Sequence, residues 1–151
     1  IQEIREWFSG PLLLSGSIAN GGAVLAAQAM GADLAYIGSA FIATDEANAD
    51  QRYKEMITES SADDIVYTNL FTGVHGNYLK GSIEAQGLDP DNLEVSDSSK
   101  MNFSSGASKP KSWKEIWGSG QGISAVKSII PAGELVNRIN NEYIEAKNKI
   151  L

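Results

Sequence analysis

Two short apolar runs near the start of the chain each end in a turn of small residues. The first covers residues 11–15 (PLLLS) and leads into residues 16–22 (GSIANGG); the second covers residues 34–37 (LAYI) and leads into residues 38–40 (GSA). An alanine-rich stretch with helical spacing lies between them. This order predicts a βαβ unit with two parallel strands and a right-handed crossover. Residues 12–14 are apolar without alternation, which predicts a strand covered on both faces.

The remainder of the chain is predicted to be mainly helical. Apolar spacing indicates helices over residues 48–60 and 76–86, and a last helix that begins near Pro131, with a short strand at residues 65–67. Residues 89–112 are rich in Asp, Ser, Asn, Gly and Lys, which is typical of a long loop.

No repeat or linker divides the chain. We therefore expect one partial domain over residues 1–151, in which residues 1–44 form βα units and residues 45–151 form an extension with helices and the long loop.

Composition narrows the classes of function. The chain has 151 residues and a formal net charge of -7, with a pI of about 4.6. Such an acidic chain is not expected to bind nucleic acid or an anionic membrane. With no Cys and one His, we expect no metal site. The sequence contains neither a membrane-spanning run nor a signal-peptide pattern, so a cytoplasmic location is expected.

The two small-residue turns are the strongest candidate for chemistry. Gly16, Gly21 and Gly22 flank the predicted start of a helix, where unpaired N–H groups and the helix dipole favour an anion. Ser17 and Ser39 add hydroxyl donors. One such loop would be an ordinary tight turn, and neither a Walker A sequence nor a clean G-x-G-x-x-G is present. Two such loops on consecutive strands favour a phosphate-bearing ligand.

Three other polar residues have competing interpretations. His75 lies among glycines and could be a base, but a cap or a surface position is favoured. Gln121 lies in a glycine-rich segment, where contact with a ligand and a plain connector are about equally supported. Glu46 could orient a binding loop, although capping of the next helix is favoured.

The order and spacing of several segments resemble the nitronate monooxygenase family, formerly called 2-nitropropane dioxygenases. The segments that carry this resemblance are residues 14–21 (LSGSIANG), 26–33 (AAQAMGAD), 36–44 (YIGSAFIAT), 46–47 (EA), 71–73 (FTG), 87–89 (GLD), 117–122 (WGSGQG) and 134–136 (ELV). Each is loose alone, but together they are specific. The resemblance covers the whole chain and matches the C-terminal part of the family.

The resemblance implies an α/β fold in which this chain forms the last two strands of a (β/α)₈ barrel and a mainly helical extension. It also implies FMN as the cofactor, with its phosphate held by the loops after those strands. The positions that match or lie near the FMN site are Gly16, Ser17, Ile18, Tyr36, Ile37, Gly38, Ser39 and Gln121. Ser17 replaces a frequent glycine of the family, and Tyr36 replaces a frequent glutamine whose amide contact is therefore lost.

The activity implied by the resemblance is oxidation of alkyl nitronates or nitroalkanes by O₂ to a carbonyl compound and nitrite. The family's catalytic histidine lies upstream, on a segment that this chain lacks; His75 does not match it, so no catalytic residue is expected here. The alternatives are an FMN-dependent enoyl-acyl-carrier-protein reductase and a catalytically inactive fragment. Residues 45–112 of the extension are expected to build a lid or a contact in a homo-oligomer.

Overall fold

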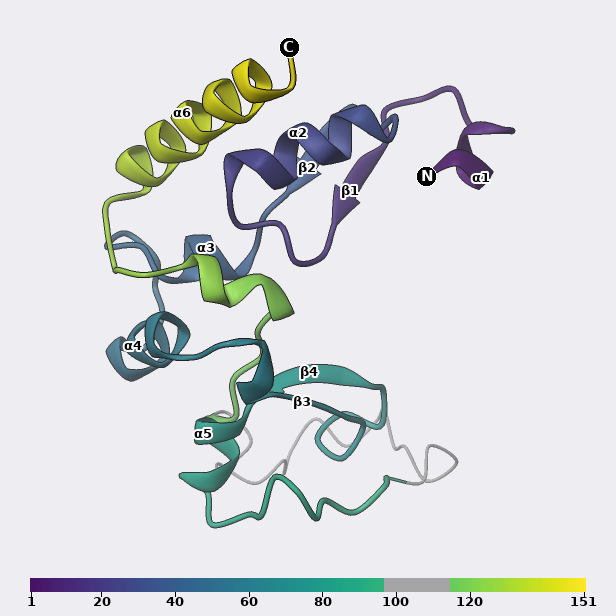
Figure 1. The fold of residues 1–151 in the computed structure, drawn as a ribbon. Helices are drawn as coiled ribbons and strands as arrows, with labels where there is room; N and C mark the ends of the chain where they lie inside the picture. The colour runs from purple at the N-terminus through teal and green to yellow at the C-terminus, as the bar shows by residue number, and fades with distance from the viewer. Residues whose placement is uncertain (97–114) are drawn as a thin grey trace.

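The computed structural model describes residues 1–96 and 115–151 and shows an α/β chain. Its elements follow one another in the order α1 (Gln2–Arg5), β1 (Leu13–Ser15), α2 (Gly21–Ala29), β2 (Leu34–Tyr36), α3 (Ser39–Ile42), α4 (Gln51–Glu59), η1 (Ala62–Asp64), β3 (Ile65–Thr68), β4 (Gly76–Leu79), α5 (Lys80–Glu84), η4 (Gln121–Ala125) and α6 (Ala132–Ile150). The pair β1–β2 with α2 and α6 lies at one end of the molecule, and β3, β4 and α5 lie at the other (Figure 1).

The first part of the chain forms the predicted βαβ unit. β1 and β2 pair in parallel, with Leu13 opposite Leu34 and Ser15 opposite Tyr36. α2 connects them and packs on one face of the pair, where Ala27 is 1% exposed. Small side chains at this contact let the helix approach the strands closely. The predicted parallel arrangement is therefore confirmed.

The opposite face of this pair is exposed, which corrects the expectation of a strand covered on both faces. Leu13 is 50% exposed, Leu34 56% and Tyr36 61%, and burial alternates along both strands. The sheet has two strands, and no described element packs on the face away from α2. A continuous apolar run predicts two-sided burial only where a second layer is present.

α6 lies along α2 (Figure 1). A Cβ atom added to Gly21 would stand 2.1 Å from the Tyr143 nitrogen and 2.2 Å from the Ile139 oxygen, so the two backbones are in direct contact. Tyr143 also donates its hydroxyl to Gln28 Oε1 at 2.6 Å. α6 begins after Pro131, as predicted.

Glu46 caps α6 rather than the next helix of the chain. Its Oε2 accepts the Ala132 N–H at 2.8 Å, and this hydrogen bond lowers the pKa of the carboxyl group. The next helix, α4, is capped by Asp50. Capping was the favoured interpretation, but the tertiary fold decides which helix start the side chain reaches.

The range 76–86 is not one helix. Its first four residues form β4, which pairs antiparallel with β3, and α5 begins only at Lys80. Leu79 is fully buried, and Tyr78 packs edge-to-face on Phe71 with ring centroids 5.0 Å apart. Pairing with β3 outweighs the local helical spacing, because it buries these side chains and satisfies the backbone at once.

The central hydrophobic cluster joins the two ends of the molecule. Its buried members are Ala19, Ala40, Ala43, Ile57, Leu79, Ile123, Val126 and Leu135. They come from the loop before α2, from α3, α4, β4, η4 and α6, and from the residues directly after α3 and η4. The predicted helix over 48–60 corresponds to α4 and the predicted strand at 65–67 to β3. Of the predicted loop at 89–112, only residues 89–96 lie in the described part.

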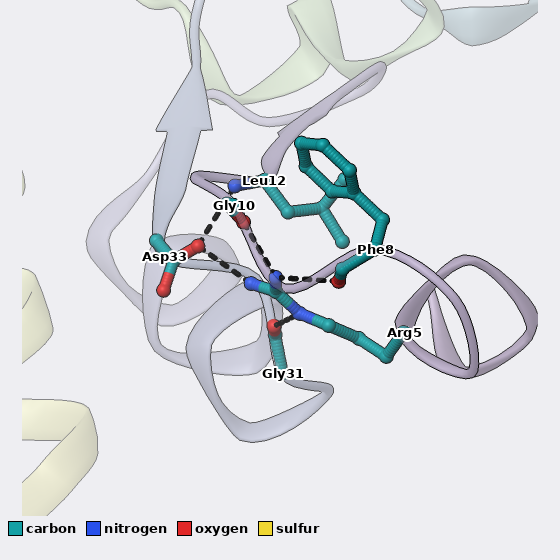
Figure 2. Close-up of polar contacts among 6 residues, drawn as sticks. All are labelled: Arg5, Phe8, Gly10, Leu12, Gly31 and Asp33. Carbon is teal, nitrogen blue, oxygen red and sulfur yellow. Dashed lines mark hydrogen bonds and ion pairs between the residues drawn. The ribbon is translucent and has the colours of Figure 1, made fainter.

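The N-terminal segment is tied to the βαβ unit through one arginine (Figure 2). Arg5 donates to the carbonyl oxygens of Gly31 at 3.0 Å and Gly10 at 2.7 Å, and pairs with Asp33 at 2.5 Å. Asp33 Oδ2 also accepts the Leu12 N–H at 2.7 Å. These bonds hold the start of β1 beside the turn that follows α2.

Candidate functional site

A pocket of about 220 Å³ opens where the loops after β1 and β2 meet a third segment. Its lining residues are Ser15, Gly16, Ser17, Ile18, Ala19, Tyr36, Gly38, Ser39, Gly120 and Gly122. The predicted positions from the two loops are therefore brought together, with Ile37 as the exception. Ile37 packs against both the central cluster and the cluster under α2.

The first loop changes direction in two residues of positive φ. Gly16 has φ +102°, which only glycine adopts readily, and Ser17 has φ +56°. Ile18 and Ala19 are buried directly after this turn and fix its end. Within the described residues, the backbone N–H groups of Ser17 and Ile18 make no hydrogen bond. They are consequently available to an acceptor in the pocket.

The second loop places a hydroxyl group at the pocket. Ser39 is the first residue of α3, and its Oγ accepts the Gly120 N–H at 2.8 Å. The Gly38 N–H makes no hydrogen bond within residues 1–96 and 115–151, and a Cβ at this position would meet nothing within 4 Å. In the part of the chain that the structure describes, the loop therefore has a free N–H and free space at Gly38, whereas Ser39 beside it is bonded to Gly120.

The third segment, residues 120–122, was only partly anticipated from the sequence. Gly120 and Gly122 line the pocket, whereas Gln121, the predicted residue, is exposed and does not. A Cβ at Gly122 would stand 2.5 Å from the Ser17 oxygen, so this segment lies directly on the first loop. The glycines on either side of Gln121 were the available signal, and at Gly122 the close backbone approach requires glycine.

The start of α2 is not open to an anion, contrary to the expectation from Gly21 and Gly22. The Gly21 N–H donates to Glu142 Oε2 of α6 at 2.9 Å, and the Ala23 N–H donates to Asn20 Oδ1 at 2.8 Å. A carboxylate of the protein already occupies the positive end of this helix. The pocket is lined instead by residues 15–19, which precede the start of α2.

The residues that line the pocket carry no charge, and none is a carboxylate or a histidine. A neighbouring cation, Arg138, donates to the Ala19 oxygen at 3.3 Å and pairs with Glu142 at 3.4 Å. An anion in this pocket would be held by backbone N–H groups and hydroxyls rather than by a lysine or arginine. The arrangement supports binding, and its lining contains no histidine, carboxylate or lysine, which are the commonest groups for proton transfer.

His75 lies away from the pocket, on the β3–β4 hairpin. It is exposed and stacks on Tyr67 with ring centroids 4.9 Å apart, which confirms the favoured surface position. Across the described residues, His, Asp and Glu nowhere gather in a group of three suited to a metal ion. No helix among them has both the length and the apolar character to cross a membrane.

The fold and the pocket define a class of protein: an α/β protein whose consecutive βα loops and a glycine segment surround a small, uncharged pocket suited to an anion. The chain belongs to the nitronate monooxygenase family, whose model matches residues 1–142. This membership confirms the resemblance seen in the sequence.

The chain is also similar to individual proteins described as nitronate monooxygenases. Over its whole length the chain is 23% identical to a probable nitronate monooxygenase of Staphylococcus haemolyticus, covering 42% of that protein. Over 87% of its length it is 29% identical to a nitronate monooxygenase of Paraburkholderia phytofirmans, covering 37% of that protein.

Solved structures agree with the fold. A nitroalkane oxidase from Streptomyces ansochromogenes matches 99% of the chain with a TM-score of 0.71 and 26% identity, covering 44% of that structure. FabK from Thermotoga maritima matches 98% with a TM-score of 0.69 and 21% identity, covering 49% of that structure. The chain thus spans less than half the length of each of these proteins.

Proposed function

We propose that this chain holds the phosphate of FMN and forms the last two βα units of a (β/α)₈ barrel. The observation that carries the proposal is the pocket itself, formed by the loops after two neighbouring parallel strands. Loops after the last two strands of such barrels commonly bind phosphate. Family membership supports a flavin as the bearer of that phosphate.

The pocket size fits a phosphate group and not a whole flavin. Pockets for complete small-molecule ligands are usually roughly 300–1,000 Å³, whereas this one is about 220 Å³. The remainder of the cofactor would extend beyond Tyr36, across the ends of the barrel strands where these loops lie. Tyr36, the last residue of β2, is 61% exposed and can contact it.

The residues present fit a phosphate dianion. The N–H groups of Ser17, Ile18 and Gly38 are unpaired within the described residues, and Ser39 adds a hydroxyl. Hydrogen bonds from such groups to a charged oxygen are about twice as strong as neutral ones. No cationic side chain is required, which suits a chain whose overall charge is negative.

We propose that the whole protein oxidises alkyl nitronates or nitroalkanes with O₂, giving a carbonyl compound and nitrite. The bound flavin would supply the electron-transfer chemistry. The pocket residues bind the phosphate end and thereby orient the cofactor. None of them is a histidine, carboxylate or lysine, so we expect the base to come from outside this pocket.

The similarity to FabK favours a second candidate, an FMN-dependent enoyl-acyl-carrier-protein reductase. The two activities use different co-substrates. Oxygen consumption with a nitronate, against oxidation of NADH with an enoyl thioester, distinguishes them in the full protein. A third candidate is that the chain by itself is inactive, which predicts no bound flavin absorbance after the chain is purified.

The phosphate site can be tested at Gly38. In Gly38→Asp the new side chain meets no atom of the protein within 4 Å of its Cβ, so it adds a negative charge without a clash. We expect FMN affinity in the full protein to fall about 100-fold, because a carboxylate would face the phosphate in a pocket partly shielded from water. Titration of flavin fluorescence measures the dissociation constant.

The matched control is Gly38→Asn, which has the same shape without the charge. It should bind FMN within about three-fold of the unaltered protein, because it adds a side chain of the same size without the negative charge. If Gly38→Asp retains stoichiometric FMN, the pocket is not the phosphate site.

A further inference from the structure

The hydroxyl oxygen of Ser39 accepts one hydrogen bond from the protein. Its Oγ accepts the Gly120 N–H at 2.8 Å, and no donated bond from this hydroxyl is formed within the described residues. A serine hydroxyl has one proton and two lone pairs. With a lone pair engaged by Gly120, the proton must point elsewhere, and Ser39 lines the pocket.

The Gly120 N–H is itself held in place. On one side of it, Tyr53 donates its hydroxyl to the Gly118 oxygen, and the Ser119 N–H donates to the Asn77 oxygen at 3.1 Å. On the other side, Gly122 lies against the backbone of Ser17. The segment is therefore fixed at both ends, and the direction of its N–H does not depend on a ligand.

From this geometry we propose that Gly120 is a positioning residue, which commits the Ser39 hydroxyl to donate its proton into the pocket. A hydroxyl oriented in this way favours a ligand group that is purely an acceptor, such as the dianion of a phosphate monoester. Segment 118–122 would thus tune selectivity for phosphate. This inference rests on the proposed function of the same pocket.

The test compares FMN with riboflavin, which lacks the phosphate, on the full protein. For each variant the ratio of the riboflavin to the FMN dissociation constant is measured by flavin fluorescence. A general loss of structure raises the dissociation constants of both ligands, so its effect cancels in this ratio. Loss of a phosphate contact raises only the FMN dissociation constant and therefore lowers the ratio.

Gly120 has φ -78°, which a proline ring accepts. Gly120→Pro removes the N–H and places the ring Cδ on the Ser39 side, so the Ser39 hydroxyl loses the orientation that this N–H gives it. We expect Ser39→Ala and Gly120→Pro each to lower the ratio about ten-fold. Ser39→Thr and Gly120→Ala, which keep the hydroxyl and the N–H respectively, should stay within about three-fold.

The double variant Ser39→Ala/Gly120→Pro decides whether the two residues act as one unit. If Gly120 acts through Ser39, the double variant has the same ratio as Ser39→Ala alone. Gly133→Ala is the control, because its Cβ enters free space in α6; its ratio of dissociation constants should equal that of the unaltered protein.

Two results would overturn the inference while leaving the site intact. One is an unchanged ratio in Ser39→Ala; the other is a full additional loss from Gly120→Pro in the Ser39→Ala background. If the unaltered protein binds riboflavin as tightly as FMN, both the inference and the phosphate site are wrong.

Discussion

Ser17 has a backbone φ of +56°, in the left-handed region that disfavours residues with a Cβ. It lies directly after Gly16 in the loop that forms one side of the pocket. Strained backbone of this kind persists where the surrounding structure fixes it, and here Gly122 and the buried Ile18 do so. The phosphate-binding proposal uses the N–H at this position, so the backbone conformation matters more than the side chain.

Ser17→Gly is therefore expected to stabilise the chain. Relief of the left-handed conformation should contribute roughly 1–2 kcal/mol, and the greater freedom of unfolded glycine should offset about half of this, leaving about 0.5–1 kcal/mol. Ser17→Val should destabilise it, because a β-branched side chain is poorly accommodated there. Urea denaturation of both variants measures the change; a less stable Ser17→Gly would contradict the role assigned to φ.

At the scale of elements, the contact between α2 and α6 organises the loop that forms the pocket. Gly21 lies against the backbone of α6, and Glu142 and Arg138 of that helix bond to the Gly21 N–H and the Ala19 oxygen. α6 thereby fixes the residues that follow the pocket loop. It also places a carboxylate at the start of α2, which closes that helix start to an external anion.

Two neighbouring glycines test this contact. Gly21→Ala should destabilise the chain by about 3 kcal/mol or more, because its Cβ would overlap backbone atoms that cannot move aside. Gly22→Ala meets its nearest atom at 3.4 Å and should be neutral or stabilising by up to about 1 kcal/mol. Thermal unfolding compares the two. Equal effects would mean that the helices are not packed through Gly21.

The tie between the N-terminal segment and β1 depends on pH. Hydrogen bonds from the Leu12 N–H and from Arg5 lower the pKa of Asp33 below its ordinary value of 3.8. The unfolded chain then binds this proton more tightly than the native chain. The stabilising contribution is complete above the unfolded pKa and is lost as the pH falls through the lower native pKa.

We expect the Leu12 amide resonance to titrate with a midpoint below 3.8, reporting Asp33. Asp33→Asn should abolish this titration. An NMR pH titration of the two proteins is the measurement. A Leu12 midpoint at or above the ordinary value would show that the carboxylate is not held by these donors.

At the scale of the whole molecule, the exposed face of β1 and β2 is the feature that most needs an explanation. Leu13, Leu34 and Tyr36 are all at least half exposed on it. The proposed barrel explains this, since these side chains would point toward strands that lie outside this chain.

Leu34→Asp distinguishes a free face from one covered in the full protein. In the 151-residue chain the substitution should change the free energy of unfolding by about 0.5 kcal/mol or less. In a longer protein that includes the other strands, it should cost about 2–4 kcal/mol, because the carboxylate would be buried. Leu135→Asp, at a position 2% exposed, should destabilise both. Equal, small effects of Leu34→Asp would contradict the barrel.

The sequence by itself determined the local elements and the family. Apolar runs and small-residue turns predicted the parallel βαβ unit, and the two loops that line the pocket, because short-range spacing specifies strands, turns and helices. Helix α6 was equally clear from its apolar period. The order and spacing of short sequence segments along the whole chain carried the family resemblance, which the family model confirmed.

Only the tertiary structure decided which distant residues meet. Residues 76–79 pair with β3 as a strand and are not part of a helix. Glu46 accepts a hydrogen bond from the start of α6, and Glu142 accepts one from the start of α2. The fold also brought Gly120 to Ser39, although 81 positions separate them in the chain. The physical reason is that a hydrogen bond or a close backbone contact between distant segments leaves no periodic signal in the sequence; it exists only when the fold places both partners together.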